Sequence, residues 1–87
     1  MHLTLLTRAY CHLCDDMLVA VEPLAAARGA RIVVVDVDTH PALERAYGHL
    51  VPVLFAGDPG NGFELCHHRL DRFRVEDALD DAAAGRA

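Results

Sequence analysis

Apolar residues follow two patterns along the chain, short uninterrupted runs and a longer stretch with helical spacing. Residues 3–6 form the first short apolar segment, and the stretch Thr-Arg-Ala-Tyr at residues 7–10 ends it. Apolar side chains then recur at i, i+3, i+4 and i+7, as is typical of one face of a helix. These positions are Cys14, Met17, Leu18, Val21, Leu24 and Ala25. The pattern predicts a strand followed by an amphipathic helix, in which Pro23 introduces a kink or the last turn and Gly29 provides a left-handed stop.

The next apolar run, residues 31–37, is β-branched and almost continuous. Such a run is typical of a strand in a parallel pair that is covered on both faces, so we expect helices to flank the sheet. Thr39 is the expected N-cap of a second helix, about two turns long, whose first turn accommodates Pro41 and which ends at Gly48. Its inner face is expected to carry Leu43, Ala46 and Tyr47.

The second half of the chain begins with two short strand patterns, residues 51–55 and 63–66. The segment 56–62 between them consists almost wholly of turn-forming residues, which predicts a hairpin. In this alternation Cys66 shares a face with Glu64 and lies on the second face of an edge strand.

The last predicted element is a helix with Asp71 as its N-cap. Leu70 and Val75 are placed to form a hydrophobic staple across this cap. The apolar face of the helix is expected to consist of Phe73, Ala78, Leu79 and Ala82. The helix is expected to fray into residues 84–87.

The predicted order of elements is β-α-β-α-β-β-α. We therefore expect an α/β fold with a four-stranded mixed sheet flanked by helices, whose first half is a right-handed parallel crossover. No repeat, linker or low-complexity segment interrupts the pattern, so residues 1–87 are expected to form a single domain. An apolar content of 53% is sufficient for a small core at this length.

Composition and charge narrow the classes of partner. The net charge is −5 and there is no run of basic residues, which argues against nucleic acid and against a membrane surface as partners. The N-terminal segment lacks the basic start of a signal peptide, and no apolar run reaches membrane-spanning length. An odd number of cysteines, three, argues against a secreted disulfide framework. We expect a cytoplasmic protein.

Two of the cysteines, Cys11 and Cys14, form a Cys-x-x-Cys at the predicted junction of strand and helix. The N–H groups and the positive dipole end of a helix N-terminus favour a thiolate over a thiol, so Cys11 is the candidate nucleophile. Cys14 lies one turn later and faces the core, as expected of the thiol that resolves a mixed disulfide. Asp15 and Asp16 suit the helix dipole but oppose a thiolate nearby.

The segments 8–14 and 50–52 carry a resemblance to a known family. A Cys-x-x-Cys between strand and helix, followed by Val51-Pro52 before the second half, resembles the thioredoxin fold in its short, glutaredoxin-like form, over nearly the whole chain. The resemblance implies a thiol-disulfide oxidoreductase in which Arg8 stands three residues before the first cysteine and Pro52 is cis. It also implies that the Val51 backbone pairs with an extended substrate segment.

Two departures from related proteins are visible. Glutaredoxins carry a Gly-Gly pair after the last strand that helps to hold glutathione, where this chain has His67-His68. Glutathione is therefore a candidate co-substrate that this departure counts against. Thioredoxins carry Trp before the first cysteine, where this chain has Tyr10, an arrangement that disfavours a true thioredoxin. We expect Tyr10 and His12 to belong to the substrate site, Tyr10 as a wall of the groove and His12 as a hydrogen-bonding group between the thiols.

The sequence favours redox chemistry on a protein or small-molecule disulfide by a monomer without a bound cofactor. Two alternatives stay open. One is a non-catalytic module that binds a metal or iron–sulfur cluster through the same cysteines, with a cluster bridged across two chains as its main form. The other is a redox-inert adaptor that keeps only the fold. We assign no metal ligand, because there is a single Cys-x-x-Cys and the adjacent His67 and His68 point different ways in a strand.

Overall fold

The computed structural model describes residues 1–83, and its order of elements is the predicted one. Each element except the short 3-10 helix η1 had been expected. The elements are β1 (His2–Thr7), α1 (His12–Ala26), β2 (Arg31–Asp36), η1 (Val37–Thr39), α2 (Pro41–Tyr47), β3 (Val53–Ala56), β4 (Phe63–His67) and α3 (Arg72–Ala83).

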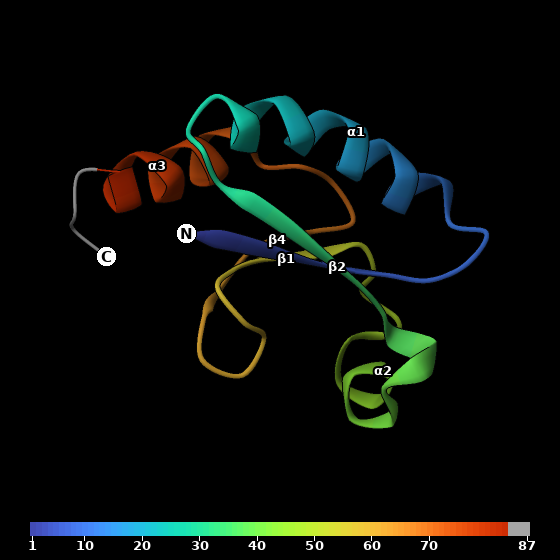
Figure 1. Cartoon of the computed structure of the whole chain (residues 1–87). Helices are drawn as coiled ribbons and strands as arrows, with labels where there is room; N and C mark the ends of the chain where they lie inside the picture. The colour runs from blue at the N-terminus through green and yellow to red at the C-terminus, as the bar shows by residue number, and fades with distance from the viewer. Residues whose placement is uncertain (84–87) are drawn as a thin grey trace.

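The four strands form one mixed sheet in the order β2-β1-β3-β4. The central strand β1 runs parallel to β2 and antiparallel to β3, and β4 is antiparallel to β3. Helices α1 and α3 cover one face of the sheet and α2 lies toward the other (Figure 1). These observations confirm the α/β fold with a four-stranded mixed sheet flanked by helices.

The core is divided by the sheet into two clusters, because successive residues of a strand point to opposite faces. Leu3 and Leu5 of β1 pack with α1 and α3 in the larger cluster. Leu6 packs with Val37 and Phe55 in the smaller cluster, against α2. Strand β1 thus supplies side chains to both cores and is held on both edges, so the loop that follows it starts from a firmly fixed point.

The expectation that residues 31–37 are covered on both faces is wrong. Strand β2 is the edge of the sheet, and within it Val33 is substantially exposed and the side chain of Val34 is 50% exposed. The β-branched run is explained by the preference of such residues for strands, and it does not indicate that the strand is buried. Only Val37, at the start of η1, is fully buried in this stretch.

The N-cap of α2 is His40 and not Thr39, because the chain first makes the η1 turn. Thr39 Oγ1 instead donates to the backbone carbonyl of Asp36 at 2.8 Å within that turn. Pro41 occupies the first turn of α2 as predicted, and Gly48 follows the helix as its C-cap. Ala46, expected on the inner face, is exposed.

The predicted alternation in the last strand is wrong at Cys66. Strand β4 pairs with β3 through a register shift, so Cys66 lies opposite Leu54 while Glu64 lies opposite Phe55. Leu65 is the extra residue of this β-bulge, and one extra residue reverses the faces beyond it. Cys66 consequently lies in the larger core cluster and not beside Glu64.

Both helices on the larger cluster begin and end largely as predicted. In α1 Pro23 lies inside the helix, which ends at Ala26, and Gly29 follows in the left-handed conformation with φ +68°. Asp71 caps α3, since its carboxylate accepts the N–H of Arg74 at 3.2 Å.

Phe73 was placed on the wrong face of α3. Its side chain is largely exposed, whereas Val75 and Leu79 are buried. Two residues along a helix correspond to about 200° of rotation, so Phe73 lies nearly opposite Val75. The described part of the chain, residues 1–83, contains no helix with the length and apolar character needed to cross a membrane.

Candidate active site

Cys11 and Cys14 lie together at the start of α1 and form a disulfide, with their Cα atoms 5.2 Å apart. Cys11 is the N-cap residue and has an extended backbone, with φ −111° and ψ 104°. The backbone N–H of Cys14 donates to Cys11 Sγ at 3.1 Å. The side chain of Cys11 thus accepts a hydrogen bond from the first turn of the helix, as a serine or aspartate does at other N-termini.

The two sulfur-bearing residues differ in accessibility. Cys14 is only 2% exposed and lies on the face of α1 that meets the sheet, whereas Cys11 is partly exposed. An incoming group can therefore reach Cys11 more easily than Cys14. The helix N-terminus behind Cys11 stabilises negative charge on its sulfur once the disulfide is opened.

Arg8 lies in the loop before α1 and binds residues of η1, of α2 and of the loop after α2. Its guanidinium donates to Asp38 at 2.8 Å and to the backbone carbonyl of Gly48 at 3.1 Å, and it lies 3.8 Å from Glu44. The hydrogen bond from Arg8 is the main cause that lowers the pKa of Asp38. The positive charge of Arg8 is therefore shared with carboxylates and is not reserved for Cys11.

Val51 and Pro52 lie at the same end of the sheet as the Cys11–Cys14 pair. Leu6, near the end of β1, pairs with Val53 at the start of β3, so the residues just before Val53 lie beside the loop that leads to Cys11. The Val51–Pro52 peptide bond is cis. Pro52 is buried and Val51 is partly exposed, which leaves the Val51 backbone near the surface.

His68 belongs to this end of the molecule and had been given no role. It follows β4 in the left-handed conformation, with φ 64°. Its backbone N–H donates to the Pro52 carbonyl at 2.8 Å, and its Nε2 lies 3.2 Å from the carbonyl oxygen of His49. Since a carbonyl only accepts, Nε2 carries the proton. His68 and Arg8 both bind the loop before β3. His68 contacts the carbonyls of His49 and Pro52, and Arg8 contacts the carbonyl of Gly48.

One indirect signal for His68 is present in the sequence. His67 and His68 stand where related proteins carry two glycines, and a glycine position is often one that needs a positive φ. Which segment the histidine contacts depends on the pairing of β3 with β4, and no local pattern reveals that pairing.

Tyr10 and His12 flank Cys11, but their side chains point away from the protein. Tyr10 has φ 59° and its side chain is fully exposed. His12 is exposed as well. Among residues 1–83 neither side chain is recorded in a hydrogen bond or ring contact, so both are available to a bound partner.

Cys66, the third cysteine, is buried in the larger core cluster. Burial raises the pKa of its thiol, which keeps it protonated and unreactive at neutral pH. His67 binds Glu64 through Nδ1 at 3.0 Å. Within the described residues no three metal-binding side chains converge on one point.

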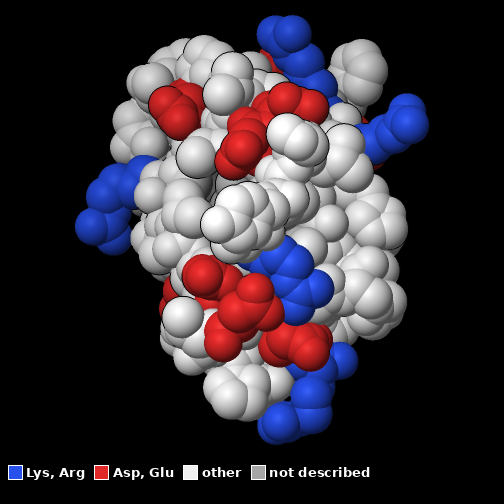
Figure 2. Space-filling view, turned by 90° about the vertical axis from the view of Figure 1, so that its right-hand side faces the viewer, with Lys and Arg blue, Asp and Glu red and all other residues white. Residues whose placement is uncertain are grey.

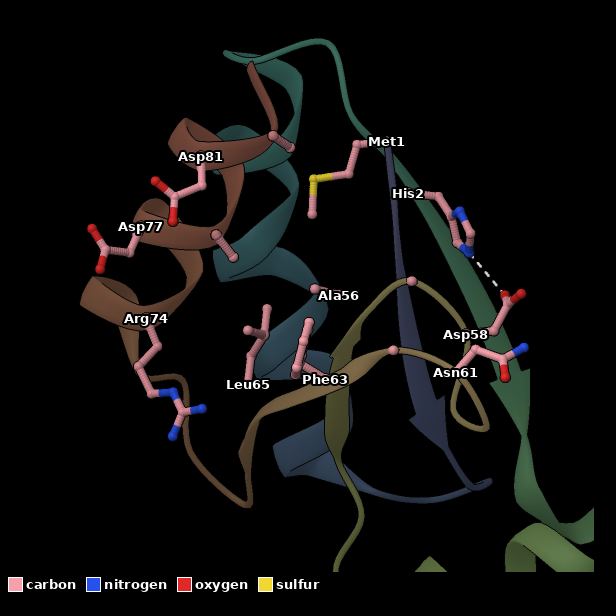
Figure 3. A pocket seen from close by; sticks show the side chains of 14 residues that line it. Met1, His2, Ala56, Asp58, Asn61, Phe63, Leu65, Arg74, Asp77 and Asp81 are labelled. Atoms are coloured by element: carbon pink, nitrogen blue, oxygen red, sulfur yellow. Dashed lines mark hydrogen bonds and ion pairs between the residues drawn. The ribbon is translucent and has the colours of Figure 1, made fainter. Parts of the chain in front are cut away.

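A cavity of about 850 Å³ lies beside the start of β1, at the opposite end of the sheet from the cysteines. Figure 3 shows the side chains that line it. Met1 and His2, at the start of β1, line it together with Phe63 and Leu65 of β4 and one side of α3. His2 is held there by a hydrogen bond to Asp58 at 2.8 Å. Because the length of β1 separates the two ends, this cavity does not adjoin the Cys11–Cys14 pair.

Two solved structures resemble the chain in sequence as well as in fold. A protein from Nitrosomonas europaea, solved by NMR, is 33% identical, with 87% of each chain covered and a TM-score of 0.75. A protein from X. campestris, solved by X-ray crystallography, is 45% identical, with 90% of this chain and 95% of that chain covered and a TM-score of 0.65.

Thioredoxin 1 from Thermosipho africanus shares the fold at 20% identity, with 97% of this chain and 96% of that chain covered and a TM-score of 0.66. A search of curated proteins found no match. The family model described as "Glutaredoxin-like domain (DUF836)" matches residues 2–80. Together with the Cys-x-x-Cys disulfide at the start of α1, this match shows that the chain belongs to the glutaredoxin-like domain family.

Proposed function

We propose that the protein is a thiol-disulfide oxidoreductase that uses Cys11 and Cys14. The observation that carries the proposal is the asymmetry of the pair. Cys11 is accessible and sits at a helix N-terminus, whereas Cys14 is buried one turn later and already within bonding distance of it. Exchange reactions need one accessible thiolate and one intramolecular thiol to finish the reaction.

In the reducing direction, the Cys11 thiolate attacks one sulfur of a substrate disulfide. A bond forms between Cys11 Sγ and that sulfur, and the other substrate sulfur leaves as a thiolate and takes up a proton from water. The backbone N–H of Cys14, which reaches Cys11 Sγ in the disulfide state, is placed to stabilise the attacking thiolate.

Cys14 completes the exchange. It loses its proton and attacks Cys11 Sγ, the mixed disulfide breaks, and the second substrate thiolate leaves and is protonated. Two electrons have then passed from the protein dithiol to the substrate, and the protein holds the Cys11–Cys14 disulfide. A thiol reductant returns it to the dithiol by the reverse exchange.

The remaining residues of the site are proposed to bind substrate. The Val51 backbone pairs with an extended segment, Tyr10 provides an apolar wall and His12 a hydrogen-bonding group beside the sulfur. Arg8 acts mainly by holding the loop before Pro52 through Gly48. The substrate is a protein or small-molecule disulfide, and glutathione is a candidate co-substrate. The protein is proposed to act as a cytoplasmic monomer without a bound cofactor.

The test is reduction of insulin and of a small disulfide by the reduced protein. Cys11→Ser should lower turnover to the uncatalysed rate, while circular dichroism shows an intact fold. Cys14→Ser should accumulate a mixed disulfide with the substrate, visible by mass spectrometry. Cys66→Ala, which removes the buried third cysteine, is the matched control and should keep turnover. Turnover that survives in Cys11→Ser would contradict the proposal.

A further inference from the structure

The surface around the redox pair carries exposed apolar side chains. Tyr10 directly precedes Cys11 and is fully exposed, and Leu13 directly precedes Cys14 and is half-exposed. Neither belongs to one of the two core clusters. Large apolar side chains beside a reactive sulfur, with no packing role in the fold, offer contact area to a bound partner.

The same surface is acidic on two sides. Figure 2 views the end of the molecule where the β1–α1 loop and α2 lie, with acidic side chains at the level of α1 and again at the level of α2 and uncharged surface between them. Basic surface borders the lower acidic group, and the rest of the basic surface in this view lies near its outline (Figure 2).

Asp15 and Asp16 lie in the first turns of α1. Both are exposed, and no ion pair is recorded for either within residues 1–83. Their charge is therefore available to a partner that approaches Cys11.

On the α2 side, the carboxylates of Asp36, Asp38 and Glu44 are balanced by cations. Arg8 binds Asp38 directly and lies near Glu44. Arg45, in α2, and Arg69 are exposed, so this side carries as many arginines as carboxylates. The unpaired negative charge that a segment docking at Cys11 meets is therefore that of Asp15 and Asp16.

We infer that this site selects disulfides that lie in basic segments, with an apolar side chain next to the cysteine and a nearby Lys or Arg that faces Asp15 and Asp16. The inference rests on the proposed redox function and adds the class of substrate. Charge complementarity raises the rate of encounter and suppresses partners of like charge. The apolar neighbour packs on Tyr10 and Leu13, while the basic residues face the carboxylates.

The test compares three disulfides as oxidants of the reduced full chain. They are a short peptide disulfide with Arg and Leu around its cysteines, the same peptide with Glu in place of Arg, and a small neutral disulfide. The ratio of the two peptide rates is the readout, because any change in the nucleophilicity of Cys11 cancels in it. The basic peptide should react faster, and the ratio should shrink toward one as ionic strength rises.

The variant Asp15→Asn/Asp16→Asn should lower this ratio by about 1.5- to 5-fold for each carboxylate removed. Asp77→Asn/Asp81→Asn, which makes the same change of charge on α3 at the far end beside the cavity, is the matched control and should leave the ratio near the wild-type value. A control variant with the same loss as the test variant would overturn the inference, since net charge would then explain it.

The remaining outcomes separate the two proposals. Equal rates for the two peptides, with the neutral disulfide still reduced, would overturn the inference and leave the proposed function standing. Failure to reduce any of the three disulfides would overturn the proposed function and the inference together.

Discussion

At the scale of single residues, Arg8 connects three segments around the redox pair. It stands in the loop before Cys11, binds Asp38 in η1, and donates to the Gly48 carbonyl in the loop that leads to Pro52. A side chain that joins the loop before Cys11 to the loop before Pro52 fixes their relative position. The connecting role of Arg8 follows from its distances to Asp38 and Gly48. The sequence shows only a basic residue three positions before a cysteine, and that spacing does not reveal the two contacts.

The pair of Arg8 with Asp38 makes stability depend on pH. Because Arg8 lowers the pKa of Asp38 below the ordinary value of 3.8, its stabilising effect is complete above that value and is lost as the pH falls through the lowered one. Arg8→Gln should therefore reduce the free energy of unfolding at neutral pH and flatten its decline in acid. Urea unfolding at neutral pH and well below pH 3.8 measures both effects.

Arg31→Gln serves as the control for that experiment. It removes the same charge from an exposed arginine for which no ion pair is recorded within residues 1–83. An equal flattening in Arg31→Gln would mean that net charge, and not the Asp38 pair, sets the acid dependence.

The three cysteines should differ in reactivity after reduction. Cys11 is partly exposed at a helix N-terminus, whereas Cys14 and Cys66 are buried and burial raises the pKa of Cys66. In a short exposure to iodoacetamide at neutral pH, mass spectrometry should find Cys11 alkylated first and Cys66 last. Urea-unfolded protein, in which all three thiols are accessible, should lose this order. Early alkylation of Cys66 would contradict its place in the core.

At the scale of elements, local patterns predicted the α-helices and the strands but not η1, and long-range pairing decided the rest. Cys11-x-x-Cys14 and Val51-Pro52 are local motifs, so the centre of the candidate site could be predicted from sequence. The face of Cys66 depends on a bulge that exists only opposite β3. The exposure of Val34 depends on β2 being an edge, which no property of residues 31–37 specifies.

The end of β4 gives a prediction about backbone conformation. His68 has φ 64°, which costs an L-residue about 1–2 kcal/mol and glycine almost nothing, and its ring binds the His49 carbonyl, a contact worth about 1 kcal/mol. His68→Ala loses the hydrogen bond and keeps the backbone cost. His68→Gly loses both, so it should be more stable than His68→Ala by about 1 kcal/mol in urea unfolding.

His67 provides the matched comparison, because it lies in β4 with an ordinary strand backbone. There glycine should be the worse choice, by about 0.5–1 kcal/mol relative to alanine. The same order of alanine and glycine at both positions would show that His68 does not hold the left-handed conformation in solution.

At the scale of the whole molecule, the sheet separates two ends with different properties. The redox pair, Pro52 and His68 lie at the end of β1, and the 850 Å³ cavity lies at its beginning. Both ends depend on the same central strand, whose side chains fill the cores on both faces. Loss of packing in β1 should therefore destabilise the fold that positions the redox site.

Leu5 of β1 and Val34 of β2 are register partners that differ in burial, which makes them a matched pair. Leu5 is fully buried, so Leu5→Ala should lower the free energy of unfolding by about 2–5 kcal/mol, a large part of the 5–15 kcal/mol typical of a domain. Val34 is half-exposed, so Val34→Ala should cost less than about 1 kcal/mol. An equal cost at Val34 would mean that β2 is covered in solution. Because an open sheet edge pairs readily with another chain, sedimentation would then be expected to find a dimer in place of the proposed monomer.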